Sequence, residues 1–566
     1  MAAIANPVLR GFSPDPSICR VGDFWYIATS TFEWFPGVQI HRSRDLRSWA
    51  LAARPLSRPG QLDMRGNPDS GGVWAPCLSH SGGMFWLVYS DMKVVQGAFK
   101  EGRNWLSTCE SVEGEWSDPV FLNSSGFDAS LFHGSDGRRH LVNMVWNHRA
   151  GEHPFGGIAL QEYCHRRRAL VGEPRIVFRG SRFGVTEAPH LYEIGGWHYL
   201  LTAEGGTGYG HMATVARSRG IEGPYEIRPG GPLISSRFSP ENPFQKAGHG
   251  SLAQAACGGW YMAYLMARPI GGDGGYRDKY RQYAGGEGLD RGYCPLGRET
   301  SLARVEWRGG WPWVAGGQPA QSAECDLPEH PPEPGPPELD RFEGAELGMQ
   351  YQTLRIPLGP DMMSLSARPG HLRLFGRESL TSRFAQSHVA RRWQSLSFDA
   401  AASVAFSPKS PQQMAGIACY YNTQNWTAFY VTFCEGKGRA LEVMAADNGE
   451  FSSPLSGAEI PVPEGAEYAH LKAEVRGGSY AYLYSFADGA IACAAGEGSG
   501  GEGGATGGAI SDGGWREVPL RFDSWKLSDD YAKGAAFTGA FAGMFCCDCS
   551  GAGLHADFAC FLHRER

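Results

Sequence analysis

The chain has 566 residues, of which 78 are glycine and 12% are aromatic, and long helical patterns are scarce. This composition predicts turn-rich β structure, and the length fits two large all-β domains. The net charge of −7 is small for this length and argues against nucleic acid as the main partner. No apolar stretch approaches the roughly 20 residues that cross a bilayer, so we expect no membrane partner.

The amino-terminal residues lack the basic and apolar regions of a signal peptide, so we expect a cytoplasmic location. The 14 cysteines are irregularly spaced. In a cytoplasmic chain, such cysteines are more often buried thiols than members of a disulfide framework.

Five segments in the first 320 residues resemble one another, and each is followed seven to nine residues later by a tight-turn pair. These turns lie 60, 54, 59 and 63 residues apart. A long fixed period of strand–turn–strand units is the signature of a radial repeat, so we predict a five-bladed β-propeller over residues 1–322. The segments open with Asp15-Pro16-Ser17, Trp74-Ala75-Pro76, Asp128-Ala129-Ser130, Glu187-Ala188-Pro189 and His249-Gly250-Ser251.

Three of these segments begin with a carboxylate, namely Asp15, Asp128 and Glu187. If the first strand of each unit lines the central axis, the three carboxylates share one cavity. Burial and mutual repulsion then raise the pKa of at least one of them. A protonated carboxyl beside an ionised carboxylate is the pairing that hydrolyses a glycosidic bond. The alternative is that each residue caps a turn or balances a cation, but three carboxylates at one repeat position favour catalysis.

The composition changes after the predicted propeller. Residues 323–340 contain six prolines, which predicts an extended, semi-rigid linker. Short strand-like runs with turn signals follow, including a hairpin over 470–484. They predict a β-sandwich, of jelly-roll type, over 341–566. The glycine-rich stretch 496–514 is predicted to be a surface loop.

The motifs of the first 300 residues resemble those of glycoside hydrolase family 43 β-xylosidases. The resemblance is carried by the five repeated segments, by residues 6–17 around Asp15, and by Pro295-Leu296-Gly297-Arg298-Glu299-Thr300. It implies an exo-acting, inverting hydrolase that releases xylose from the non-reducing ends of β-1,4-xylooligosaccharides. It also implies that Asp15 is the general base, Asp128 modulates the pKa of the acid, and Glu187 is the general acid.

The resemblance also implies residues that bind the sugar. Phe32 and Trp74 would form walls of its subsite, Arg298 would hydrogen-bond its hydroxyls, and Trp146 would line the mouth. For Phe32, Trp74 and Arg298 the alternatives are core packing, blade packing and a surface ion pair. The run 271–288 is longer than the family pattern and could reshape the rim of the pocket.

His249 has two interpretations. The resemblance places it near the base of the central cavity, contacting the substrate site and beside a Ca²⁺ ion or its waters. Because calcium prefers oxygen ligands, His249 would contact it through water. The alternative is a buried histidine that bonds to its neighbours. No cofactor is expected to be required.

Other functions fit parts of the sequence. The closest alternative is an α-L-arabinofuranosidase or a bifunctional xylosidase/arabinofuranosidase, with arabinofuranosides as substrates. A non-catalytic sugar-binding propeller would lose one of the three carboxylates, and a protein-interaction propeller would need none of them. The resemblance further implies that the second domain packs on the active-site mouth, although a carbohydrate-binding module is the alternative. Homo-oligomers are frequent among family members.

Overall fold

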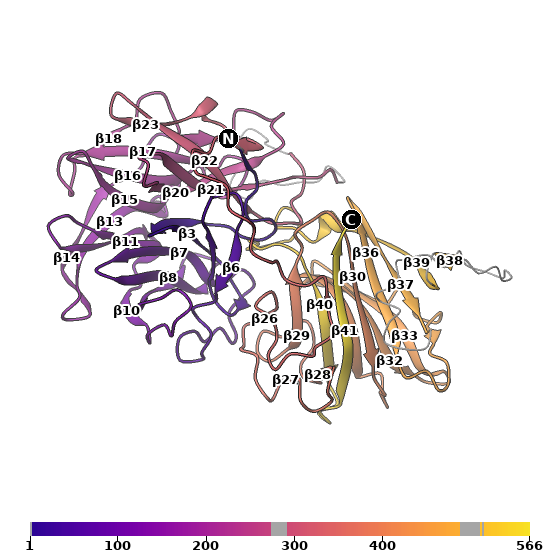
Figure 1. The fold of residues 1–566 in the computed structure, drawn as a ribbon. Helices are drawn as coiled ribbons and strands as arrows, with labels where there is room; N and C mark the ends of the chain where they lie inside the picture. The colour runs from indigo at the N-terminus through magenta and orange to yellow at the C-terminus, as the bar shows by residue number, and fades with distance from the viewer. Residues whose placement is uncertain (1–2, 273–290, 487–509, 512–513) are drawn as a thin grey trace. The chain divides into compact units, whose positions relative to one another are not determined.

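The computed structural model describes residues 3–272, 291–486, 510–511 and 514–566 (Figure 1). The run 271–288, which is longer than the family pattern, and the predicted surface loop 496–514 therefore lie mostly outside the described residues. The chain divides into two compact units, Met1–Pro334 and Gly335–Arg566. Helical structure among the described residues is limited to two 3-10 turns, η1 (Ala315–Gly317) and η2 (Ser524–Lys526). Neither has the length and apolarity needed to cross a membrane.

The first unit contains five antiparallel sheets of four or five strands besides a two-stranded one, and each of the five is formed from one continuous stretch of the chain, which confirms the predicted five blades. The blades are β2 (Ser17–Val21), β3 (Phe24–Thr29), β5 (Gln39–Ser43) and β6 (Ala50–Ala53); β7 (Gly72–Ser81), β8 (Met84–Val94), β9 (Glu101–Cys109) and β10 (Val120–Asn123); β11 (Gly126–His133), β12 (Arg139–Trp146), β13 (Phe155–Cys164) and β14 (Ala169–Phe178); β15 (Glu187–Ile194), β16 (Trp197–Glu204), β17 (Met212–Ser218), β18 (Glu226–Ile227) and β19 (Ile234–Ser235); and β20 (Gln245–Gln254), β21 (Trp260–Ala267), β22 (Glu299–Arg308) and β23 (Trp311–Val314). Three short strands complete this unit, β1 (Ile4–Ala5), β4 (Trp34–Phe35) and β24 (Ser322–Ala323), and β1 pairs with β24.

The first strand of each blade is the inner one. β2 contacts both β7 and β20, and β11 contacts both β7 and β15, so the ring closes between the fifth blade and the first (Figure 1). The third residue of the repeated motif explains how neighbouring inner strands are joined. Blades 1, 3 and 5 have a serine there, and each hydroxyl donates to a carbonyl of the next blade. The three bonds are Ser17 Oγ to Leu78 O, 3.4 Å; Ser130 Oγ to Pro189 O, 2.5 Å; and Ser251 Oγ to Pro16 O, 2.8 Å.

The leading residues of the motifs lie at irregularities of the inner strands. The pairing register shifts at this point in the inner strands of blades 2 to 5. Asp15, Asp128 and His249 also have left-handed backbone conformations, with φ of 57°, 54° and 43°. Such bulges re-aim a side chain, and strained φ values cluster at functional sites. The inner strand therefore changes direction where the carboxylates are displayed.

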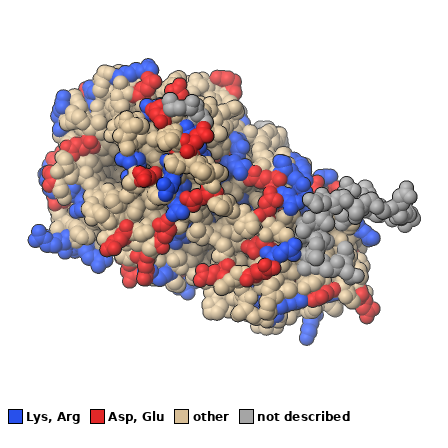
Figure 2. All heavy atoms as spheres, viewed as in Figure 1, with Lys and Arg blue, Asp and Glu red and all other residues tan. Residues whose placement is uncertain are grey.

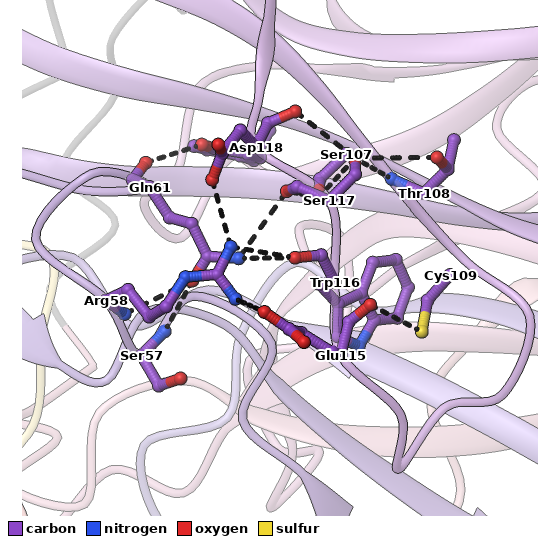
Figure 3. A network of polar contacts seen from close by, with 11 residues as sticks. Ser57, Arg58, Gln61, Ser107, Thr108, Cys109, Glu115, Trp116, Ser117 and Asp118 are labelled. Carbon is purple, nitrogen blue, oxygen red and sulfur yellow. Dashed lines mark hydrogen bonds and ion pairs between the residues drawn. The ribbon is translucent and has the colours of Figure 1, made fainter.

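A polar network fixes the connection between the first two blades (Figure 3). Arg58 lies beyond β6 and forms ion pairs of 2.9 Å with Glu115 and with Asp118, which lie between β9 and β10. Gln61 Nε2 donates to the carbonyl of Trp116, 3.0 Å away. The connecting segment is thereby held on the outer part of blade 2.

The second unit consists of two large antiparallel sheets, as expected for a β-sandwich. One sheet has the order β27 (Met363–Ser364), β28 (Leu372–Phe375), β41 (His555–Glu565), β30 (Ser397–Ala405), β36 (Ala469–Arg476), β37 (Ser479–Ser485), β39 (Trp515–Asp523) and β38 (Ile510–Ser511), and β25 (Leu339–Asp340) pairs with β41. The other runs β34 (Glu450–Ser452), β33 (Gly438–Asp447), β32 (Asn425–Cys434), β31 (Gln413–Asn422), β40 (Phe541–Asp548), β29 (Ser387–Arg392) and β26 (Gln352–Leu354), and β35 (Ile460–Pro461) pairs with β33.

Charged side chains of both signs are interspersed over the face shown in Figure 2. The described residues on this face therefore form no extended surface of one sign. The predicted packing of the second domain on the active-site mouth stays a prediction.

Candidate active site

Asp15 is buried next to groups that favour its ionised form. Ser30 Oγ donates a 2.6 Å hydrogen bond to Oδ2, and Arg298 Nη1 donates one of 2.9 Å to Oδ1. His249 Nδ1 lies 3.4 Å from the same Oδ1. Burial by itself favours the neutral acid, but Arg298, His249 and Ser30 together outweigh it and lower the pKa of Asp15. Asp15 is therefore the carboxylate of the site that stays ionised.

Glu187 and Asp128 have the opposite electrostatic character. Each is 8% exposed. Burial raises the pKa of Glu187 to about 7, Lys100 opposes this rise, and the charge of Asp15 adds to it. Burial and the charges of Glu187 and Asp15 raise the pKa of Asp128 well above its usual value. Because two neighbouring buried carboxyls cannot both ionise cheaply, the pair keeps a proton at pH values where Asp15 has lost its own.

Lys100, which no motif predicted, faces Glu187 and Asp128, the two carboxyls whose pKa values are raised. Its pKa is lowered by burial, while the charges of Glu187 and Asp128 act in the opposite direction. The ammonium also lies over three aromatic rings. The distances from Nζ to the ring centroids are 5.4 Å for Trp74, 5.0 Å for Phe127 and 4.6 Å for Trp146. Cation–π attraction thus holds the charge beside the carboxyl pair.

The predicted sugar-binding aromatics Phe32, Trp74 and Trp146 form one continuous row together with Phe127. Ring centroids are separated by 5.8 Å between Phe32 and Trp74, 5.1 Å between Trp74 and Phe127, and 6.3 Å between Phe127 and Trp146. The guanidinium of Arg298 lies 5.6 Å from the Phe32 centroid. The structure therefore brings Phe32, Trp74, Trp146 and Arg298 together with the carboxylates, and His249 joins them through Asp15.

The connections between the second and third strands of the blades supply most of the remaining residues. Phe32 lies between β3 and β5, Lys100 between β8 and β9, and Arg298 between β21 and β22. Thr207, which bonds to Glu187, and His211, whose charge would lower the pKa of Asp15, come from the connection between β16 and β17. Antiparallel strands place these connections at the same end as the start of the inner strand. That topological rule could have found Lys100 and Thr207, although neither belongs to a motif.

The surroundings of His249 offer no ready set of metal ligands. Among the described residues, no group of three or more His, Cys, Asp or Glu side chains is placed to hold a metal ion. The nearest carboxylate oxygen, Asp15 Oδ1, already accepts from Arg298. Calcium takes six to eight oxygen ligands, so His249 and Asp15 do not by themselves fit the ion. Calcium held through water stays a prediction, and no chemical step is derived through it.

Two family models match the chain. Residues 4–312 match the model described as "Glycosyl hydrolases family 43". Residues 339–500 and 508–564 match the one described as "Beta xylosidase C-terminal Concanavalin A-like domain". The sandwich of the second unit agrees with the second match.

Similar proteins cover the whole chain. A β-xylosidase of Bacillus subtilis (strain 168) is 50% identical over 567 residues, which is 100% of both chains. A xylosidase/arabinosidase of Humicola insolens is 41% identical over 100% of this chain and 98% of its own. The crystal structure of a xylan β-1,4-xylosidase from Bacillus halodurans C-125 is 45% identical, with a TM-score of 0.89 over 99% of this chain and 100% of that one. The chain therefore belongs to glycosyl hydrolase family 43.

Proposed function

We propose that the protein is an exo-acting, inverting β-xylosidase that releases xylose from the non-reducing ends of β-1,4-xylooligosaccharides. Membership of the family implies a carbohydrate substrate. The relatives from Bacillus subtilis and Bacillus halodurans, which align over nearly their full length, support xylosides as that substrate. The single observation that carries the mechanism is the opposite displacement of two pKa values, downward for Asp15 and upward, to about 7, for Glu187.

In this mechanism Glu187 is the general acid and Asp15 the general base. At a pH between their pKa values, Glu187 holds a proton that it donates to the leaving glycosidic oxygen. Ionised Asp15 takes a proton from the water that attacks the anomeric carbon from the opposite face of the sugar. Burial and the charges of Glu187 and Asp15 raise the pKa of Asp128 well above its usual value, so Asp128 shares the retained proton with Glu187 and in this way modulates the pKa of the acid.

The stereochemistry of the product tests this proposal. Proton NMR of xylobiose hydrolysis, recorded before mutarotation, is expected to show α-xylose first. β-Xylose first would indicate a covalent intermediate and would overturn the assignment of Asp15 as a base. Asp15→Ala and Glu187→Ala should each remain folded and lose hydrolysis; wild-type rates in either variant would contradict the role of the residue replaced.

A second activity, release of arabinose from α-L-arabinofuranosides, is supported by the Humicola insolens relative, a xylosidase/arabinosidase. The same variants test whether one active site or two separate sites catalyse the two reactions. If one site performs both reactions, Glu187→Ala abolishes both. Hydrolysis of an aryl α-L-arabinofuranoside with no turnover of xylobiose would make arabinofuranosidase the main activity.

A further inference from the structure

Two fully buried glutamates lie next to the active site and are not among its three carboxylates. Glu204 ends β16, Glu299 begins β22, and both are 0% exposed. A buried carboxylate is costly unless its oxygens accept hydrogen bonds. Each of these carboxylates accepts several bonds, and the donors include the chain segment that leads into Glu187 or into Asp15.

Glu204 binds the segment that precedes Glu187. Its Oε1 accepts from the backbone N–H of Ser181, 2.6 Å away, and from Thr186 Oγ1, 2.9 Å away. Its Oε2 accepts from the hydroxyl of Ser181. Since Thr186 directly precedes Glu187, one carboxylate holds both ends of the segment 181–186.

This segment has little room to shift. Gly180 has φ of 91°, and a Cβ placed on it would lie 1.9 Å from Thr186 Oγ1 and 3.1 Å from Glu204 Oε1. The backbone N–H of Gly205 also donates to the carbonyl of Gly184 over 2.9 Å. The segment is thus packed directly on Glu204 and on the residue that follows it.

Glu299 binds the segment that precedes Asp15. Its Oε1 accepts from the backbone N–H of Gly11 at 2.7 Å. Arg268 forms a two-pronged ion pair with it, through Nε at 2.6 Å and Nη2 at 2.9 Å. Glu299 also directly follows Arg298, the residue that bonds to Asp15. The Glu299 carboxylate therefore links the segment that carries the base to the arginine that lowers the pKa of that base.

The neighbours of Glu299 reinforce the same segment. The backbone N–H of Ser13 donates to the carbonyl of Arg298 over 2.9 Å. Thr300 Oγ1 donates to the carbonyl of Ser13 over 2.5 Å. The segment 11–13 is therefore bound along its length to residues 298–300.

We propose that Glu204 and Glu299 are positioning residues, Glu204 for the general acid Glu187 and Glu299 for the general base Asp15. This inference rests on the proposed function, because it assumes those two roles. Neither residue contacts the reacting atoms. Each acts by fixing the backbone from which the acid or the base projects, and misplacement of a catalytic group by about 1 Å can cost roughly 100-fold in rate.

The two roles predict different changes in the pH profile. Glu204→Gln keeps the side-chain shape but weakens the charge-assisted bonds to the segment 181–186. Water then reaches Glu187, burial raises its pKa less, and the alkaline limb of kcat/KM moves to lower pH. The charged groups that face Glu187, which are Lys100, Asp15, Asp128 and Arg298, are unchanged in this variant.

Glu299→Gln should instead move the acidic limb of the pH profile. The segment 11–13 and Arg298 loosen, so the guanidinium lowers the pKa of Asp15 less. Asp15 then ionises at a higher pH, and the acidic limb of kcat/KM moves upward. The other titratable groups that face Asp15, which are His249, His211, Glu187 and Asp128, are unchanged in this variant.

The experiment measures kcat/KM against pH for an aryl β-xyloside and for xylobiose, in the wild type and both variants. Glu226→Gln and Glu306→Gln are matched controls, since both glutamates are exposed and each pairs with one arginine. We expect kcat/KM to fall roughly tenfold or more in each test variant, with Glu204→Gln shifting mainly the alkaline limb and Glu299→Gln mainly the acidic limb. The controls should retain both limbs. Ser181→Ala, which removes one donor to Glu204, should give a smaller shift in the direction of Glu204→Gln even if that variant folds poorly.

Folded variants in which neither limb moves would overturn the proposal. So would equal shifts of both limbs in both variants, because general loosening of the propeller, rather than positioning, would then explain the loss. A wild type that cleaves only α-L-arabinofuranosides would overturn the proposed xylosidase function alone. The same limbs, recorded on that substrate, would still test the two positioning roles.

Discussion

Arg298 and Asp15 lie 283 residues apart in the sequence, yet a 2.9 Å hydrogen bond joins Arg298 Nη1 to Asp15 Oδ1. Both side chains are buried, with 3% and 6% exposed. The contact exists because the fifth blade closes the ring beside the first, where β20 contacts β2. This contact keeps Asp15 ionised while Glu187 retains its proton. Closure of the ring therefore creates the difference in pKa between the two carboxyls on which acid–base catalysis depends.

Removing this cation should raise the pKa of Asp15. In Arg298→Ala, burial is no longer offset by the guanidinium, so Asp15 is protonated over more of the acidic range. Because the base must be ionised, the acidic limb of kcat/KM moves to higher pH, and kcat/KM at pH 6 falls by roughly 100-fold or more. The pH profile on xylobiose measures both effects. Arg308→Ala, which removes an exposed arginine paired with Glu306, is the control and should match the wild type.

Glu187 should make the stability of the protein depend on pH. Its pKa is about 7 in the folded state, against an ordinary value of 4.5. The folded state therefore binds more protons than the unfolded one, and the free energy of unfolding falls as pH rises from 4.5 to 7. Glu187→Gln cannot titrate, so relative to the wild type it should gain roughly 1–3 kcal/mol over this range.

Urea denaturation of the wild type and of Glu187→Gln at pH 5 and pH 8 measures this gain. Glu173→Gln serves as the control, since Glu173 is exposed on β14 and its replacement should change stability equally at both pH values. An unchanged difference between Glu187→Gln and the wild type at the two pH values would contradict the raised pKa.

Lys100 should lower the pKa of the acid and help to bind the substrate. In Lys100→Met the cation that opposes the rise in the pKa of Glu187 is lost, so the alkaline limb of kcat/KM moves to higher pH. We also expect KM to rise, because the ammonium faces the site from the aromatic row. Kinetics at several pH values measure both changes, and exposed Lys409→Met should show neither. A shift of the alkaline limb to lower pH would refute the electrostatic role.

The sequence predicted the blades because their signals are local. Glycines such as Gly22 and Gly195 mark the turns whose regular spacing reveals the repeat, and the motif that precedes each turn identifies the inner strand. The meeting of Asp15, Asp128 and Glu187 follows from the repeat alone, without any long-range information. Their individual roles stay predictions, which the product stereochemistry and the pH profiles test.

Other parts of the site depend on long-range contacts that leave no local pattern. Lys100 lies in a connection that no motif marks, and its position is set by three rings from two blades. Glu204 and Glu299 look like ordinary charged residues until folding buries them. The left-handed backbone conformation of Asp128 is equally hard to predict from the sequence, since aspartate adopts this φ in many turns. The rule that second-to-third-strand connections share one end of the propeller recovers Lys100 but not the two glutamates.

The serine bridges between inner strands should contribute measurably to stability. Ser130 is 3% exposed, and its hydroxyl donates to Pro189 O over 2.5 Å. Ser17 is 2% exposed and accepts from the N–H of Leu78 over 3.0 Å. Substitution by alanine leaves a buried carbonyl or N–H without its partner, which costs about 1–3 kcal/mol. Ser130→Ala and Ser17→Ala should each lower the free energy of unfolding by that amount in urea denaturation.

The double variant tests whether these are independent bridges. Ser17 joins blades 1 and 2, whereas Ser130 joins blades 3 and 4, so their losses should add to within about 0.5 kcal/mol. Ser124→Ala, at an exposed position between β10 and β11, should leave stability unchanged. If Ser130→Ala were as stable as the wild type, the alternation of serine and proline along the motifs would need an explanation other than joining the blades. If the losses were far from additive, the bridges would act through a cooperative deformation of the whole ring rather than one pair of blades at a time.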